Sequence, residues 1–140
     1  MKFDKFALAP ELQENLINNG YFRTTDIQYK AIPAIMNGED VLAIAQTGSG
    51  KTAAFAIPII NHIHHTKSNK SSNWVSCLVM VPTRELAKQI GEVFAKLTKR
   101  TKASSYAIYG GVEQDPQISQ LHGGIDILIA TTIIENGIDL

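Results

Sequence analysis

Two glycines and a Lys-Thr pair in residues 45–52, Ala-Gln-Thr-Gly-Ser-Gly-Lys-Thr, have the spacing of a phosphate-binding loop. Glycine adopts positive φ without a Cβ penalty, so two glycines here allow consecutive backbone N–H groups to line a concave anion site. The lysine supplies a mobile cation for β and γ phosphates, and the threonine hydroxyl offers an oxygen to Mg²⁺. The residues expected to bind phosphate are Thr47, Gly48, Ser49, Gly50, Lys51 and Thr52, with Thr52 contacting the metal.

Such a loop needs a strand before it and a helix after it. The apolar run Val41 to Ala45 is typical of a buried strand, and helix-like sequence begins near Lys51, whose first turn would favour an anion. The alternative is an ordinary Gly-Ser turn with Lys51 in solvent. The spacing together with the flanking pattern favours the phosphate site.

Length and composition limit the class of protein to which this site can belong. The chain has 140 residues, 44% of them hydrophobic, which suffices for one core. Thirteen Lys and Arg balance thirteen Asp and Glu, so any binding to nucleic acid must be local. The single Cys77 lies in an apolar run and is expected to be a small buried hydrophobe. No stretch approaches the roughly 18 apolar residues of a membrane span, so we expect a cytoplasmic protein without membrane contact.

Short apolar runs alternate with longer amphipathic stretches, which predicts an α/β fold with a parallel sheet. Strands are expected at 41–45, 75–81, 106–109 and 125–130, and helices at 10–19, 25–37, 51–65, 84–99 and 113–122. Gly20 and Gly38 should end the first two helices. Residues 66–73 are polar and aperiodic, as in a loop.

Five sequence elements in register resemble the DEAD-box RNA helicases. Residues 20–28 resemble the Q motif, and Phe3 stands seventeen positions before Gly20, where that family has an aromatic residue. Residues 45–52 match motif I, residues 82–86 match motif Ia, and Gly110-Gly111 matches the GG element. One departure is Thr24, where the family usually has proline. The resemblance implies the N-terminal RecA-like lobe of such a helicase, with a P-loop.

The resemblance implies two ligands, an adenine nucleotide with Mg²⁺ and RNA. The amide of Gln28 can pair with N6 and N7 of adenine, and Phe3 can stack on the base of ATP or ADP. Alternatively, Gln28 is a solvated helix residue and Phe3 packs into the core. RNA-backbone contacts are implied for Pro82, Thr83, Arg84, Gly110 and Gly111. Thr83 also fits the N-cap of a helix, and the two roles are compatible.

The C-terminal part departs from the family. The Thr-Pro-Gly-Arg element, the Asp-Glu-Ala-Asp box, the Ser-Ala-Thr motif and the second RecA-like lobe do not occur, and residues 131–140 resemble motif V of another helicase group. We therefore expect a truncated or chimeric chain with a seam between about residues 124 and 132. The expected organisation is a Q-motif helical segment at 1–40, a partial RecA-like P-loop domain of about four core strands at 41–130, and an atypical segment at 131–140.

These departures set the expected activity. Because the carboxylates of the box are missing, we assign no catalytic residue and expect nucleotide binding with little or no hydrolysis by this chain alone. The segment 41–45 would have exposed edges, which favours either re-pairing of strands or a homodimer. Two other functions stay open at this point: a generic P-loop nucleotide-binding module, and an engineered or truncated structural protein without activity.

Overall fold

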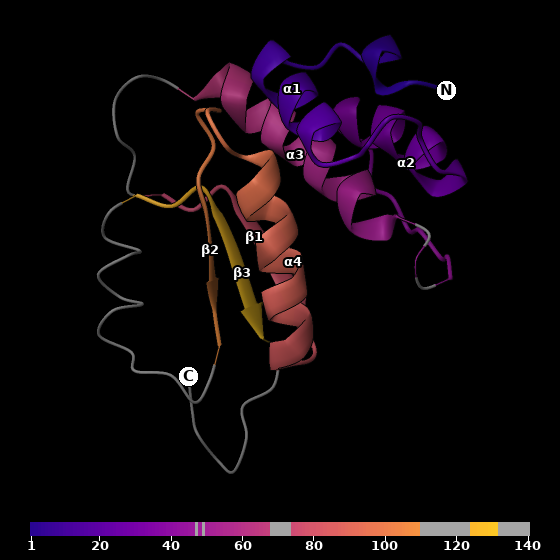
Figure 1. The fold of residues 1–140 in the computed structure, drawn as a ribbon. Helices are drawn as coiled ribbons and strands as arrows, with labels where there is room; N and C mark the ends of the chain where they lie inside the picture. Colours follow the sequence, from indigo (N-terminus) through magenta and orange to yellow (C-terminus); the bar gives the residue numbers. More distant parts are fainter. Residues whose placement is uncertain (47, 49, 68–73, 110–123, 132–140) are drawn as a thin grey trace. The chain divides into compact units, whose positions relative to one another are not determined.

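The computed structural model describes residues 1–46, 48, 50–67, 74–109 and 124–131 (Figure 1). The chain divides into two compact units, one of residues 1–67 and 96–102, the other of residues 68–95 and 103–140. After a short 3-10 turn, the elements are α1 (Pro10–Asn18), α2 (Asp26–Met36), α3 (Lys51–Thr66), β1 (Cys77–Val81), α4 (Arg84–Leu97), β2 (Ser105–Ile108) and β3 (Ile127–Thr131).

Helices α1 and α2 begin and end at the residues whose chemistry favours helix ends. Pro10 occupies the first position of α1, where a backbone N–H is not needed, and Gly20 follows the helix with a φ of 81°. Thr25 caps α2, and Gly38 follows it with a φ of 80°. Both helices are confirmed to within one residue at each end, because capping signals are local in sequence.

The core of the first unit forms where α3 packs against α1 and α2. The fully buried apolar side chains there include Leu12, Leu16, Ile32, Ile57 and Ile60. Buried Asn61 on α3 accepts a hydrogen bond from the Ala9 N–H at 2.8 Å and donates to the Ala7 carbonyl at 3.3 Å. This amide fixes the position of α3 relative to the segment that leads into α1.

Asn15 joins α1 to residues 96–102, which belong to the same unit. Its side chain is 3% exposed, and its Nδ2 donates to the Leu97 carbonyl at 2.9 Å and the Lys99 carbonyl at 2.6 Å. The last carbonyls of a helix have no partner within the helix. Asn15 therefore supplies from α1 the donors that the C-terminal end of α4 needs.

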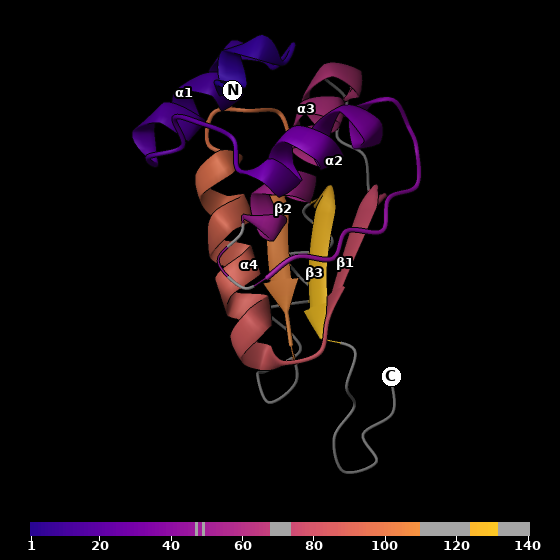
Figure 2. The ribbon, with the colours of Figure 1, turned by 90° about the vertical axis from the view of Figure 1, so that its right-hand side faces the viewer.

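The second unit contains a parallel sheet in which β3 lies between β1 and β2 (Figure 2). Parallel strands of one sheet require crossover connections, and α4 is the connection from β1 to β2. Helix α4 approaches β2 closely at Gly91, where an added Cβ would lie 3.2 Å from the Ala107 Cβ. The predicted parallel sheet is confirmed; β1 and β3 begin two residues later than expected, and β2 begins one residue earlier.

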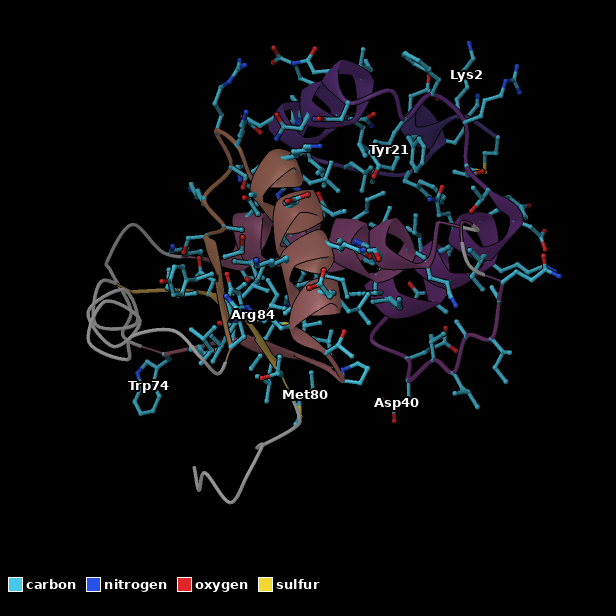
Figure 3. The ribbon with its side chains drawn as sticks, turned by 60° about the horizontal axis from the view of Figure 1, so that its bottom comes forward. Lys2, Tyr21, Asp40, Trp74, Met80 and Arg84 are labelled. Carbon is cyan, nitrogen blue, oxygen red and sulfur yellow. The ribbon has the colours of Figure 1, made fainter. Side chains whose placement is uncertain are left out.

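The two faces of this sheet differ in exposure. Side chains alternate along a strand, so Val79, Ala107 and Ile129, which share a register, lie on the face that α4 covers. Leu78 and Met80 lie on the other face and are 56% and 60% exposed. Trp74, three residues before β1, is 80% exposed and is labelled in Figure 3.

Cys77 begins β1 and is half-buried. Burial raises the pKa of its thiol above the ordinary value, which keeps the sulfur protonated and unreactive. This environment agrees with the expected role of a small hydrophobe.

The strand predicted for residues 41–45 is wrong. The segment has no strand pairing, and Leu42 and Ile44 are 89% and 87% exposed. A strand exists only when its backbone groups pair with another strand, and the segment finds no such partner among the residues that the structure describes. Three strands are therefore present in the described part of the chain, where about four were expected.

Part of the predicted secondary structure cannot be compared. The helix expected at 113–122, most of the loop expected at 66–73, and nearly all of the segment 131–140 lie outside the described residues. Within the described helices, none is long and apolar enough to cross a membrane.

Replacing Asn15 with alanine should destabilise the protein by about 1–3 kcal/mol, because two partly or fully buried carbonyls lose their donor. Asn18→Ala is the matched control, since Asn18 is exposed on the same helix and gains the same helix propensity. Urea denaturation followed by circular dichroism would measure both. Equal stability of the two variants would show that the Asn15 bonds contribute nothing.

Candidate functional site

The loop before α3 has the backbone geometry that its glycines predict. Gly48 and Gly50 each have a φ of 84°, a left-handed conformation that glycine adopts at little cost. Helix α3 begins at Lys51, directly after Gly50. The expected positive φ at both glycines and the expected helix start are confirmed, whereas Thr47 and Ser49 lie outside the described residues.

Lys51 bends back across this loop. Its Nζ donates to the Ala45 carbonyl at 2.6 Å, and its side chain is exposed. The contact joins the first residue of the loop to the lysine at its end. The ammonium group thus lies at the loop, on a carbonyl oxygen that an incoming anion could replace, and Thr52 follows in the first turn of α3.

Gln28 connects the start of α2 to the same loop. Its Oε1 accepts from the Thr25 N–H at 3.0 Å, which completes a capping box with the Thr25 hydroxyl. Its Nε2 donates to the Gly50 carbonyl at 3.2 Å, and the residue is 2% exposed. The structure therefore brings Gln28 and Gly50 together, and the expectation of a solvated Gln28 is wrong because both ends of the amide have internal partners.

The space beside Gly50 is filled by this arrangement. A Cβ at Gly50 would collide with the Gln28 amide and lie 3.1 Å from the Thr25 hydroxyl. A Cβ at Gly48 or Gly38 would meet nothing within 4 Å, although both have nearly the same φ as Gly50. Position 50 is thus restricted to glycine by its backbone conformation and, independently, by the Gln28 side chain.

Phe3 lies in an aromatic cluster at the N-terminus of the first unit. The ring is 3% exposed and contacts Phe6 and Tyr21, with centroid distances of 6.4 Å and 6.3 Å. This is the core packing that the sequence left open as the alternative to stacking on a base. A stacking role would require the ring to leave these neighbours, so it stays a prediction.

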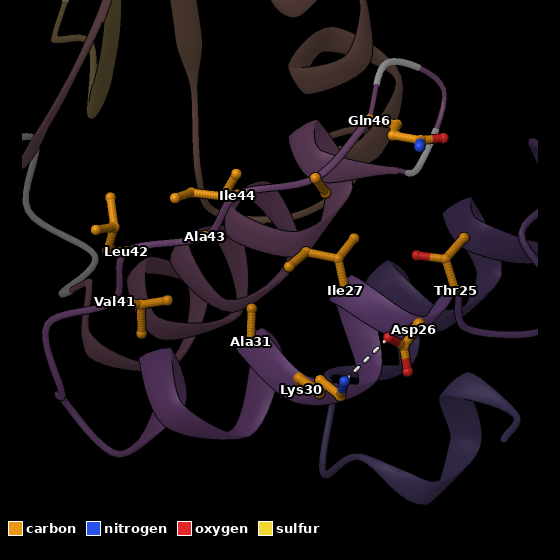
Figure 4. Close-up of a pocket in the computed structure, with 11 residues that line it drawn as sticks. Thr25, Asp26, Ile27, Lys30, Ala31, Val41, Leu42, Ala43, Ile44 and Gln46 are labelled. Carbon is orange, nitrogen blue, oxygen red and sulfur yellow. Dashed lines mark ion pairs between the residues drawn. The ribbon is translucent and has the colours of Figure 1, made fainter.

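A groove of about 510 Å³ runs between the first two turns of α2 and the segment Val41 to Gln46 (Figure 4). On the helix side it carries the Asp26–Lys30 ion pair, whose atoms are 3.1 Å apart. On the other side, the exposed apolar segment leads directly into the phosphate loop. Thr25 and Gln46 lie at the end of the groove next to the loop, and Ala31 and Val41 lie at the other end (Figure 4).

The residues expected to contact RNA begin α4 in the second unit. The Thr83 hydroxyl accepts from the Leu86 N–H at 3.1 Å, which confirms the expected N-cap. Pro82, Thr83 and Arg84 are exposed, and Arg84 is marked in Figure 3. Gly110 and Gly111 lie outside the described residues.

One feature of this region was missed from the sequence. Arg84 and Lys88 both lie over the ring of Tyr109, with the guanidinium carbon 5.0 Å and the ammonium nitrogen 5.9 Å from its centroid. Their spacing of four residues on α4 could have signalled a shared face, but nothing local in the sequence points to Tyr109.

Asp126 is buried and hydrogen-bonded to a neighbouring segment of the protein. Its carboxylate is 4% exposed and accepts from the Ser104 N–H at 2.9 Å and the Ser104 hydroxyl at 3.1 Å. These bonds join the segment before β2 to the start of β3. In the described part of the chain, no group of three or more His, Cys, Asp or Glu side chains is placed to hold a metal ion.

Gly50→Ala should destabilise the protein more than Gly38→Ala. The second change adds only the left-handed backbone strain of about 1–2 kcal/mol, whereas the first also displaces Gln28. In a double-mutant cycle measured by urea denaturation, Gln28→Ala should recover about 0.5–3 kcal/mol of the loss at Gly50. Strict additivity of Gly50→Ala and Gln28→Ala would mean that the two residues do not interact.

Known proteins with similar sequence and structure agree on one family. The model of the DEAD/DEAH box helicase family matches residues 25–135. The chain is 40% identical over 129 residues to the DEAD-box ATP-dependent RNA helicase RhpA of Helicobacter pylori, covering 92% of the chain and 25% of that protein. It is 39% identical to DEAD-box ATP-dependent RNA helicase 14 of Arabidopsis thaliana, covering 94% of the chain and 21% of that protein.

A solved structure gives the same result at the level of the fold. A DEAD box protein from the hyperthermophile Methanococcus jannaschii matches with a TM-score of 0.80 at 34% identity, over 94% of this chain and 34% of the other. The chain thus spans a quarter or less of the length of these curated relatives, and its parallel α/β fold is that of a RecA-like domain. Since the family model matches most of its length, the chain belongs to the DEAD/DEAH box helicase family.

Proposed function

We propose that the chain is the ATP-binding N-terminal part of an ATP-dependent RNA helicase. In this proposal the phosphate loop and Gln28 bind an adenine nucleotide with Mg²⁺, and the start of α4 binds the RNA backbone. The observation that carries the nucleotide site is the hydrogen bond from the Gln28 amide to the Gly50 carbonyl at 3.2 Å. This bond places the group that can read adenine at the end of the loop that can hold its phosphates.

The residues of the loop fit a bound nucleotide. The left-handed conformation of Gly48 and Gly50 is the one that can turn backbone N–H groups toward an anion, and the first turn of α3 adds the positive end of its dipole. Lys51 can exchange the Ala45 carbonyl for a phosphate oxygen. Thr52 would hold Mg²⁺, which neutralises phosphate charge when it is bound.

Adenine recognition by Gln28 requires the amide to change partners. A side-chain amide has two N–H donors and two acceptor lone pairs, and the structure uses one donor for Gly50 and one acceptor for Thr25. One donor and one lone pair suffice for N7 and N6 of adenine, and guanine presents the wrong pattern at that edge. Because Gln28 is 2% exposed, its amide must leave Thr25 or Gly50 to present these groups to a base. We propose that Phe3 stacks on the base after leaving its aromatic cluster.

RNA binding at the start of α4 is supported by exposure and by charge. Pro82, Thr83 and Arg84 present a hydroxyl, a guanidinium group and first-turn N–H groups to solvent. Such groups bind phosphate oxygens without reading the base sequence. Gly110 and Gly111 would allow close approach of the RNA backbone.

Several features of the whole helicase stay predictions. They are the organisation into segments 1–40, 41–130 and 131–140, the seam between about residues 124 and 132, the cytoplasmic location, and the second RecA-like lobe as a partner. Pairing between two copies of the chain is supported by the exposed side chains of Leu42 and Ile44. A gene that encodes both sides of the seam in one natural reading frame would exclude a chimera.

Calorimetric titration should show that ADP binds more tightly than GDP by about 1–3 kcal/mol, the usual discrimination by a two-bond contact to a base. Gln28→Glu should reduce this preference, because the carboxylate keeps the capping box but cannot donate to N7. Gln89→Ala, an exposed position on α4, is the control. Equal affinities for ADP and GDP would favour a generic P-loop module, and the absence of heat with every nucleotide would favour a structural protein.

We expect ATP hydrolysis by the 140-residue chain to stay at the level of its Lys51→Ala variant, with or without RNA. The reason is that the sequence lacks the Asp-Glu-Ala-Asp box that would hold the Mg²⁺ shell and orient water. A phosphate-release assay with added single-stranded RNA would measure this. RNA-stimulated release above the Lys51→Ala background would contradict the expectation.

A further inference from the structure

Two cations from one helix share a single aromatic ring in the second unit. Arg84 is the first residue of α4, Lys88 follows one turn later, and Tyr109 comes directly after β2. The guanidinium carbon of Arg84 is 5.0 Å and the Nζ of Lys88 is 5.9 Å from the centroid of Tyr109. Both distances are within the range of cation–π attraction. We call these three residues the Tyr109 cluster.

The two cations of the Tyr109 cluster make no ion pair within the described part of the chain. Arg84 and Lys88 are exposed, and neither makes an ion pair with a residue that the structure describes. Like charges four residues apart on a helix repel each other. A ring face attracts each cation through its quadrupole, but it does not neutralise either one. The cluster therefore holds two positive charges close together at the surface, where an anion with more than one charge would stabilise them.

The position of the Tyr109 cluster indicates that its anionic ligand is a polynucleotide. Arg84 belongs to the segment that the proposed function assigns to the RNA backbone, and Lys88 extends the same helix face by one turn. We propose that Lys88 is a further RNA-backbone contact and that Tyr109 is a positioning residue, whose ring holds both cations where they meet phosphate groups of one strand. This inference rests on the proposed RNA binding and deepens it.

Tyr109 acts in this proposal by limiting side-chain freedom. Free lysine and arginine side chains lose considerable rotamer entropy when they are fixed against a ligand. A ring that already holds the two heads near their bound positions reduces this loss on binding. The aromatic ring, not the hydroxyl, holds the two cations. Tyr109→Phe should therefore keep them in place, and Tyr109→Leu should release them.

The test is fluorescence anisotropy of a labelled 15-nucleotide oligouridylate, titrated with the 140-residue chain over a series of KCl concentrations. Tyr109→Leu should weaken binding roughly two- to fivefold, the loss expected for a cation–π contact at an exposed site, and Tyr109→Phe should bind like the unmodified chain. Lys88→Gln should also make the slope of log K against log salt shallower by about 0.7, as for one lost phosphate contact on a single strand.

Lys96→Gln is the matched control, since Lys96 is exposed on the same helix two turns beyond Lys88. This substitution should leave the affinity for oligouridylate and the slope of log K against log salt unchanged. Circular dichroism would confirm that each variant is folded. The NMR signal of the Arg84 Nε–H gives a readout without RNA: it should be shifted upfield by the ring current, keep that shift in Tyr109→Phe and lose it in Tyr109→Leu.

The outcomes separate this inference from the proposed function. If the unmodified chain binds oligouridylate and both Tyr109→Leu and Lys88→Gln bind equally well, the cluster has no RNA role although the proposed function stands. If the unmodified chain binds no RNA at low salt, the proposed RNA binding fails and this inference fails with it. Equal affinity for polyglutamate would assign the cluster to an acidic protein instead and overturn the inference.

Discussion

The bond between the Gln28 amide and the Gly50 carbonyl constrains most of the first unit. The Gly50 carbonyl also accepts from the Ala54 N–H at 3.1 Å, so one oxygen both begins α3 and accepts a hydrogen bond from the third residue of α2. Because Gln28 is simultaneously part of the capping box, the start of α2 and the start of α3 cannot move independently. The end of the phosphate loop is fixed by the same contact.

A ligand at the loop therefore affects more than its own contacts. Any rearrangement that draws the Gln28 amide toward a base competes with its bond to Gly50, and the half-buried Gly50 carbonyl would then keep only the Ala54 N–H as its donor, at a free-energy cost. Nucleotide binding and the packing of α2 against α3 are linked through this competition. The linkage needs no movement of distant elements, since all the groups belong to one compact unit.

Local chemistry explains which features the sequence could predict. Pro10, Gly20, Thr25 and Gly38 act on their immediate neighbours, so the bounds of α1 and α2 followed from them. The phosphate-loop glycines were predictable for the same reason. In contrast, the run Val41 to Ala45 has strand composition but no strand partner among the described residues, and composition cannot reveal whether a partner exists.

Contacts between residues that are distant in the sequence were the second kind of feature that the sequence could not predict. The pairing of Gln28 with Gly50 spans 22 residues, and the contact of Arg84 with Tyr109 joins α4 to the end of β2. Neither contact has a periodic signal, because both depend on how the elements pack. The buried amides of Asn15 and Asn61 were overlooked for the same reason, although they determine how α1, α3 and residues 96–102 fit together. Buried polar groups of this kind favour one arrangement over others of similar hydrophobic burial.

The exposed segment after α2 also bears on the solubility of the protein. Residues 41–50 contain no charged side chain, and Leu42 and Ile44 are open to solvent in a sequence rich in β-forming residues. These are the properties of segments that seed aggregation. Asp40 and Lys51 stand at the two ends of the uncharged run, where charged residues act as gatekeepers against stacking of identical chains. The cation proposed to meet phosphate is thus also the charge that ends this uncharged, apolar run.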